Sequence, residues 1–201
     1  MPRRDVSEQR RSDIIQAAAQ VFNAMGLHQA RMDDVAAAAG ISKGTIYLYF
    51  PSKDSLIEAL LHRLFEPLDA ALASLAASDG PIRGQLLNYA VETLHTFAAA
   101  RPIHPLILEL FALSRRQPTA ERVFTAYFVR YRAELTAILT AAQQADSVTL
   151  RAFEDDAGQA ALAFMAALEG ILLLVMINPD LLTAEQDGLN IMRAWVDGVC
   201  T

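Results

Sequence analysis

The segment GISKGTIYLYFPSKDSL, residues 40–56, gathers side chains that can bind phosphate groups. It holds both lysines of the chain, Lys43 and Lys53, which lie ten residues apart. Their ammonium groups suit phosphate oxygens, and the phenolic hydroxyls of Tyr47 and Tyr49 can donate hydrogen bonds to the same oxygens. The segment therefore has the chemistry of a nucleic-acid contact.

Two short helices must position these side chains. The pattern predicts one helix over about 32–39, which Gly40 breaks, and a second over about 43–50, which Ser42 caps. The connection AAGIS between them is typical of a helix-turn-helix, which presents the start of its second helix to a DNA major groove.

The start of the second helix combines several features that suit DNA. Free N–H groups near Ser42 favour a phosphate, and Gly44 lets the backbone approach the bases closely. Thr45 offers a hydroxyl and a methyl group, which can read a base edge or a thymine methyl. Ile46 and Phe50 are four residues apart and are expected to face inward. The alternative is an ordinary solvated face, which the preceding helix, the turn and the caps disfavour.

Almost every other segment predicts helix and none predicts a hairpin, so we expect an all-α fold of about nine helices. The first helix is expected from about Ser7, which caps it, to Met25, with Gly26 in a left-handed Schellman ending. Thr183 and Gln186 are expected to form a capping box at the last helix. The remaining helices are expected from a cap at Ser52 to about Ala77, and over 82–100, 104–115, 118–144, 152–177 and 184–199.

The composition indicates an ordered protein, because 53% of its 201 residues are hydrophobic and 20% are charged. The formal net charge of −6 argues against nucleic acid at first, but residues 1–55 hold seven basic against six acidic residues. The single Cys200 excludes an internal disulfide framework and fits a reducing compartment. No signal peptide is visible, and the apolar stretch 160–177 contains Glu169, which favours a buried helix over a membrane span. We expect a cytoplasmic location.

The stretch SDIIQAAAQVFNAMG, followed by ARMDDVAAAAGISKGTIYLYFPSKDSLIEALL, resembles the DNA-binding domain of tetracycline-repressor-type (TetR) transcriptional regulators. The match covers about residues 12–61. The resemblance implies a three-helix helix-turn-helix domain over 1–55 and a helical ligand-binding and dimerisation domain over 56–201. It also implies a homodimer on a palindromic operator in double-stranded DNA, a hydrophobic small-molecule effector and no cofactor.

The resemblance assigns DNA contacts by position. Lys43, Thr45, Tyr47, Tyr49 and Lys53 match the family's DNA-contacting positions. Arg31 departs from the family, which often has Thr there, and Arg can bind phosphate but cannot cap a helix as Thr does. With the groups argued above, the candidate DNA-binding residues are Arg31, Ser42, Lys43, Gly44, Thr45, Tyr47, Tyr49 and Lys53.

Beyond about residue 65 nothing points to one member of the family. By analogy, helices four to seven are expected to enclose an effector in a mostly apolar cavity. The candidate lining residues are Tyr89, His95, His104, Glu109, Phe111, Phe124, Tyr127 and Tyr131. The last two helices are expected to form a four-helix interface in the dimer. Its candidate residues are Phe164, Leu168, Ile171, Leu172, Val175, Leu189, Met192, Trp195 and Val196. Ordinary packing within one chain remains the alternative for both sets.

The sequence argues against an enzyme, because it has no Ser/His/Asp or Cys/His set, no phosphate loop and no paired carboxylates with a site around them. His62, His95 and His104 have no spacing that indicates a metal site. The preferred function is a ligand-responsive repressor. An activator, or a DNA-binding protein that senses no small molecule, remains an alternative, and the effector and the operator stay open.

Overall fold

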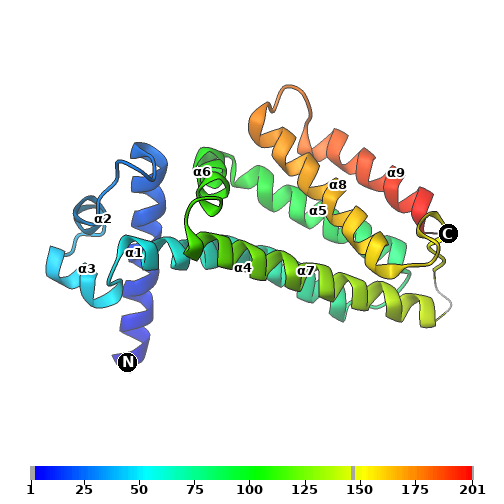
Figure 1. Cartoon of the computed structure of the whole chain (residues 1–201), viewed down its shortest axis with the longest axis horizontal. Coiled ribbons are helices and arrows are strands. Elements are labelled where there is room, and N and C mark those ends of the chain that lie inside the picture. The colour runs from blue at the N-terminus through cyan, green and yellow to red at the C-terminus, as the bar shows by residue number, and fades with distance from the viewer. Residues whose placement is uncertain (1–2, 146–147, 201) are drawn as a thin grey trace. The chain divides into compact units, whose positions relative to one another are not determined.

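The computed structural model describes residues 3–145 and 148–200, and over these ranges it has nine α-helices and no strand (Figure 1). This confirms the predicted all-α fold. The helices are α1 (Arg3–Met25), α2 (Met32–Ala38), α3 (Lys43–Tyr49), α4 (Lys53–Ala77), α5 (Ile82–Ala99), α6 (His104–Ser114), α7 (Pro118–Gln144), α8 (Ala157–Ile177) and α9 (Leu189–Val199). Shorter helical turns cover Arg101–Ile103, Arg151–Phe153 and Ala184–Gly188.

The chain divides into two compact units. The first contains the residues up to Phe65 together with Pro102–Thr125, and the second contains Glu66–Arg101 together with the residues from Ala126 onward. Each unit has its own buried core. The helices α4 and α7 contribute one segment to each unit.

The first unit is built on α1, against which α2 packs, while α3 packs against α2 (Figure 1). Its core forms because α1 repeats apolar residues at helical spacing, so that Ile14, Ala18 and Phe22 share one buried face. Other buried apolar residues of this unit are Val35, Ile46, Phe50, Leu56, Leu60, Leu106 and Leu110.

Two helices begin where the sequence did not predict. The helix α1 begins at Arg3, so the predicted cap at Ser7 is wrong, since no Gly or Pro in the preceding turn stops the helix. The helix α8 begins at Ala157 instead of 152. The side chain of Asp156 accepts from the N–H groups of Gly158 and Gln159 and caps it there.

Gly26 ends α1 in the left-handed conformation, with φ of +80°, as predicted. The ending differs from a Schellman motif. The Gly26 N–H donates to the Phe22 carbonyl at 2.8 Å, but the Leu27 N–H donates to the Glu109 carboxylate. The motif is therefore the simpler left-handed type with one backbone bond, and α6 supplies the second acceptor.

The sequence predicts a capping box between Thr183 and Gln186, but the partner of Thr183 in the structure is Asp187. The Asp187 carboxylate accepts from both the N–H and the hydroxyl of Thr183, at 2.9 Å each. The segment Ala184–Gly188 is a π-helical turn, which adds one residue to the hydrogen-bonded ring. The reciprocal acceptor therefore lies four residues after the cap, and these hydrogen bonds from Thr183 lower the pKa of Asp187.

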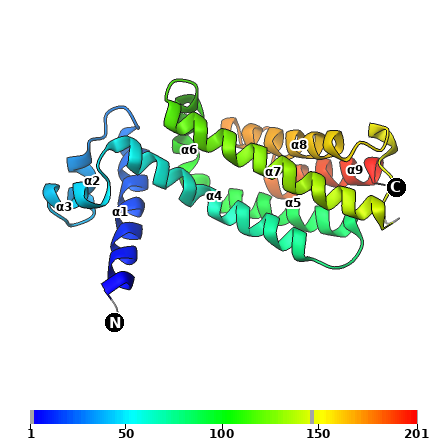
Figure 2. The same cartoon turned by 60° about the horizontal axis from the view of Figure 1, so that its bottom comes forward.

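In the second unit, α5 packs against α8 and α9, and Figure 2 shows these three helices together. The helix α8 is long and apolar enough to cross a membrane, yet 44% of its most apolar window is buried inside the chain. Buried apolar residues recur along it at helical spacing, which is the pattern of a core helix.

Most of the residues predicted for the dimer interface lie in this core. Phe164, Leu168, Ile171, Leu172, Val175, Met192 and Val196 are buried against their own chain. Leu189 and Trp195 are partly exposed, and the Trp195 ring packs edge-on against the Phe164 ring at 5.3 Å. Because both helices are apolar on more than one side, periodicity alone did not identify which face points inward.

A polar cluster interrupts the core of the second unit. The rings of Tyr89 and Tyr127 each lie 6.0 Å from that of Tyr131. Burial raises the pKa of Tyr89 to about 12 and that of Tyr131 well above its ordinary value. Burial also raises the pKa of Glu169, on α8, from 4.5 to about 7.

Stability should therefore depend on Glu169 in a defined pH range. The folded chain keeps the Glu169 proton at pH values where the unfolded chain has lost it, so unfolding releases a proton. The free energy of unfolding should fall as the pH rises from about 4.5 to about 7, by at most ~3 kcal/mol. Glu169→Gln should remove this decline in urea titrations over a pH series.

The matched control is Glu92→Gln, which replaces an exposed carboxyl on α5. Its pH profile should run parallel to that of the wild type. Parallel profiles of Glu169→Gln and the wild type would instead show that the Glu169 carboxyl is solvated.

Candidate nucleic-acid interface

The candidate interface centres on α3, a helix of only seven residues that is fixed at its N-terminus by Ser42. The Ser42 hydroxyl accepts from the Thr45 N–H at 3.1 Å and hydrogen-bonds the Thr45 hydroxyl at 2.8 Å. Ser42 is thus the predicted N-cap. The preceding Gly40 has φ of +65°, and the N–H groups of Gly40 and Ile41 donate to the carbonyls of Ala37 and Ala36. This is a complete Schellman turn, which sets the angle between α2 and α3.

The other end of α3 is held by a residue far away in the sequence. The Arg11 guanidinium, on α1, donates to the Tyr49 carbonyl at 3.2 Å and lies 4.3 Å from the centre of the Phe50 ring. The carbonyls at a helix C-terminus lack partners within the helix, and a cation is favourable there. With Ile46 and Phe50 buried beneath it, α3 is fixed at both ends and on its inner face.

The outer face of α3 carries most of the residues predicted to contact DNA. Lys43, Gly44 and Tyr47 are exposed, and Thr45 and Tyr49 are partly exposed. Leu48 is 84% exposed, the highest value among the large apolar side chains of the described residues. An apolar side chain in this position can contact a thymine methyl group.

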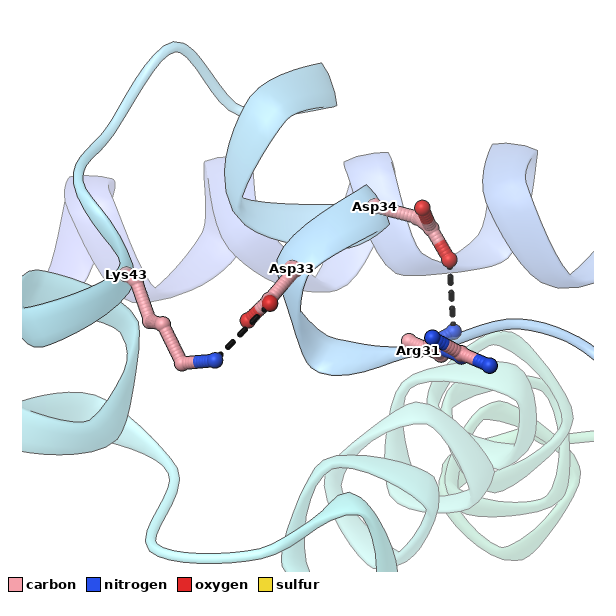
Figure 3. A network of polar contacts seen from close by, with 4 residues as sticks. All are labelled: Arg31, Asp33, Asp34 and Lys43. Carbon is pink, nitrogen blue, oxygen red and sulfur yellow. Dashed lines mark hydrogen bonds and ion pairs between the residues drawn. The ribbon is translucent and has the colours of Figure 1, made fainter.

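Lys43 and Arg31 meet two carboxylates at the start of α2, as Figure 3 shows. The Lys43 ammonium pairs with Asp33 at 2.8 Å, and this hydrogen bond raises the pKa of Lys43. The Asp34 carboxylate accepts from the backbone N–H of Arg31 at 2.8 Å. The donor-only Arg31 side chain cannot accept from the helix, so Asp34 supplies the one half of a capping box that is possible here.

Lys53 lies differently from the other predicted contacts. It is the first residue of α4 and is only partly exposed. Its ammonium group donates to the backbone carbonyls of Leu27 and Ala30, the second at 2.7 Å. Burial lowers the pKa of this ammonium group below its ordinary value.

The residues predicted to line an effector cavity fall in both units. Tyr89, Tyr127 and Tyr131 come together in the second unit, where His95 is exposed. In the first unit His104 is buried, Glu109 accepts from the Leu27 N–H, and the rings of Phe111 and Phe124 lie 4.6 Å apart. In the described part of the chain, no three His, Cys, Asp or Glu side chains gather as they would around a metal ion.

Two residues of the candidate interface, Leu48 and Arg11, were not predicted from the sequence. A signal for Leu48 was present, since it lies two residues from each of the inward-facing Ile46 and Phe50 and so falls on the opposite side of the helix. No local signal existed for Arg11, because its contact with Tyr49 joins positions 38 residues apart.

Comparison with known proteins assigns the chain to a family. Residues 14–60 match the model of bacterial regulatory proteins of the tetR family, and residues 82–201 match the C-terminal region of the BetI-type transcriptional repressor. The chain belongs to the TetR family. This confirms the predicted family, which is a family of transcriptional regulators and not of enzymes.

Relatives and solved structures agree with this membership. The HTH-type transcriptional regulator BetI of Burkholderia thailandensis is 31% identical over 125 residues, which span 61% of this chain and 64% of BetI. The structure of the SmeT–triclosan complex, SmeT being a repressor of Stenotrophomonas maltophilia, has a TM-score of 0.84 at 18% identity and covers 96% of this chain and 92% of SmeT. NalD of Pseudomonas aeruginosa has a TM-score of 0.79 at 17% identity and covers 96% of this chain and 98% of NalD. At these identities the two structures support the TetR fold.

Lys43 provides a test of this interface. If its ammonium group neutralises one DNA phosphate per protomer, Lys43→Gln should weaken DNA binding and lower the slope of log K against log salt by about two per dimer. The thermal unfolding midpoint should not change, because the Lys43–Asp33 pair is exposed to solvent. Fluorescence anisotropy over a salt series measures the slope.

Arg122→Gln is the matched control. It removes a positive charge from an exposed ion pair of the same unit, formed between Arg122 on α7 and Glu58 on α4. Its slope should equal that of the wild type. An unchanged slope for Lys43→Gln would place Lys43 outside the phosphate contact.

Proposed function

We propose that the protein is a repressor that binds a palindromic operator as a homodimer and leaves it when a hydrophobic small molecule binds. The observation that carries this proposal is the exposed face of α3, held by Ser42 at one end and by Arg11 at the other. A rigid short helix with Lys43, Gly44 and Tyr47 on its outer face suits a DNA major groove.

The contacts divide by chemistry. Lys43, Tyr47 and the free N–H groups at the start of α3 bind phosphates and so set the register on the duplex. Thr45 and Leu48 face the bases, where the Leu48 side chain selects a thymine methyl. Arg31, the residue before α2, supplies a further contact to a DNA phosphate.

The dimer forms through the outer sides of α8 and α9, and not through their buried faces. On α8, Leu162, Ala166, Gly170, Leu173 and Ile177 make one stripe at helical spacing, and none of them is buried. A Cβ atom added at Gly170 or at Gly198 of α9 would meet nothing within 4 Å in the single chain. Small residues between larger apolar ones let helices of two protomers approach closely, as a four-helix interface requires.

The effector binds in the second unit, at the polar cluster formed by Tyr89, Tyr127 and Tyr131. The Tyr131 and Thr93 side chains are buried, and within the described residues neither hydroxyl makes a hydrogen bond of normal geometry. Buried polar groups are costly without a partner, so a ligand that supplies one is favoured. The surrounding rings favour an apolar ligand body. The complex of SmeT with triclosan supports a small-molecule site in this fold.

Release from DNA follows if the effector prefers the form of the protein that binds DNA poorly, because a ligand shifts a population only by its difference in affinity. In this proposal residues 1–55 bind DNA and residues 56–201 bind the effector and the second protomer. A regulator of this kind acts on the chromosome, and we place it in the cytoplasm.

Selection of bound fragments from the source genome tests the proposal directly. The purified protein should enrich one pseudo-palindromic sequence, since a two-fold symmetric dimer presents two α3 helices to two half-sites. Binding to the enriched fragment should weaken steeply as salt rises. Binding without sequence preference would contradict an operator-specific repressor.

The dimer surface is tested by Gly170→Arg. The substitution puts a long charged side chain where α8 would meet its partner, without a clash inside the chain. It should give a monomer in sedimentation velocity and reduce operator affinity at least ~tenfold, while helix content by circular dichroism stays unchanged.

The control is Gly84→Arg, the same change at an exposed glycine of α5 with equally open surroundings. It should remain a dimer with wild-type affinity. If Gly170→Arg remains a dimer too, the interface lies elsewhere.

A further inference from the structure

Lys53 occupies a position that the family uses for DNA contact, yet its ammonium group already has acceptors within the protein. It donates to the Leu27 and Ala30 carbonyls, both partly buried. The Phe22 ring lies 5.7 Å away, which favours a cation there as well. If Lys53 turned toward a phosphate, it would leave two carbonyl groups unpaired, which is unfavourable.

These carbonyls belong to the loop of residues 26–31, which joins α1 to α2. The same loop is held from another side, since the Leu27 N–H donates to the Glu109 carboxylate at 2.6 Å. The Leu27 and Ala30 side chains are buried beneath the loop. The backbone of Leu27 is thus bound at its N–H by an anion from α6 and at its carbonyl by a cation from α4.

The loop is connected through α2 to α3, the helix that we propose binds in the major groove. It ends at Arg31, the first residue before α2, and α2 packs against α3 through the turn at Gly40. Since α2 has only seven residues, it cannot hold its place without external contacts. A displacement of the loop would therefore move α2, and α3 with it.

We propose that Lys53 and Glu109 are positioning residues for DNA binding: together they hold the loop 26–31, and Lys53 makes no contact with DNA phosphate. They form the loop clamp. This inference rests on the proposed DNA-binding function for its affinity measurements, but the clamp can also be measured without DNA.

Lys53 and Glu109 line a surface pocket of about 500 Å³, together with His28, Ile57 and Arg116. A shorter side chain at 53 or 109 opens into this pocket and creates no enclosed cavity in the core. Variants at both positions are therefore expected to fold.

The salt dependence of operator binding separates positioning from phosphate contact. On the enriched operator fragment, Lys53→Gln should lose affinity by about tenfold or more, the scale of a lost charge-assisted hydrogen bond, with an unchanged salt slope. Lys43→Gln serves as the positive control, with a reduced slope. A slope reduced by about two per dimer for Lys53→Gln would overturn the proposal and restore a phosphate contact.

Substitution of Glu109 separates two effects on DNA affinity, because loss of its charge and loss of its positioning role act in opposite directions. Loss of a carboxylate near a DNA-binding surface should raise affinity through charge alone, whereas loss of a positioning residue should lower it. Glu109→Ala should therefore bind about tenfold more weakly, and Glu109→Gln, whose amide oxygen can still accept from the Leu27 N–H, should keep most of the affinity. Equal or tighter binding by Glu109→Ala would overturn the proposal.

Amide hydrogen exchange at Leu27 tests the clamp without DNA. The Leu27 amide should be protected in the wild type and in Glu109→Gln and should exchange faster in Glu109→Ala, while amides in α1 stay protected. Fast exchange of the Leu27 amide in the wild type would show that the loop clamp does not form. This conclusion would hold whether or not the protein binds DNA. Near-ultraviolet circular dichroism of each variant confirms that binding is compared between folded proteins.

Discussion

The backbone of the loop 26–31 is the constraint on which the candidate interface depends. Its polar groups need partners, and although the Ala30 N–H donates to the Gly26 carbonyl within the loop, the Leu27 N–H and the carbonyls of Leu27 and Ala30 are bound from outside it. Two distant side chains of opposite charge satisfy this need: Glu109 accepts from the Leu27 N–H, and Lys53 donates to the Leu27 and Ala30 carbonyls. The position of α2, and through it of α3, follows from these hydrogen bonds.

A recognition helix of seven residues is far below the length at which a helix is stable alone. It is stable because other groups hold its N-terminus, its C-terminus and its inner face. Ser42 satisfies the N-terminus, the Arg11 guanidinium satisfies the Tyr49 carbonyl, and Ile46 anchors the inner face in the core. The outer face is left free for DNA, which explains why Leu48 can be exposed there.

The sequence predicted the parts of the interface that local rules determine. Gly40, Ser42 and Ile46 each act within a few residues of themselves, so turn, cap and buried position could be inferred. Arg11, Lys53 and Glu109 act across 23 to 82 positions, and no local pattern indicates their partners. The choice of a face for the dimer interface was limited for a different reason. Because α8 is apolar on two sides, its period could not distinguish the core face with Phe164 from the outer face with Gly170.

The most direct measurement is a crystal structure of the protein bound to its selected operator fragment. We expect α3 to lie in the major groove with the Lys43 ammonium group on a phosphate, while the Lys53 ammonium group stays on the Leu27 and Ala30 carbonyls. A complex in which α3 lies outside the groove, or in which Lys53 has left the loop for a phosphate, would contradict this expectation.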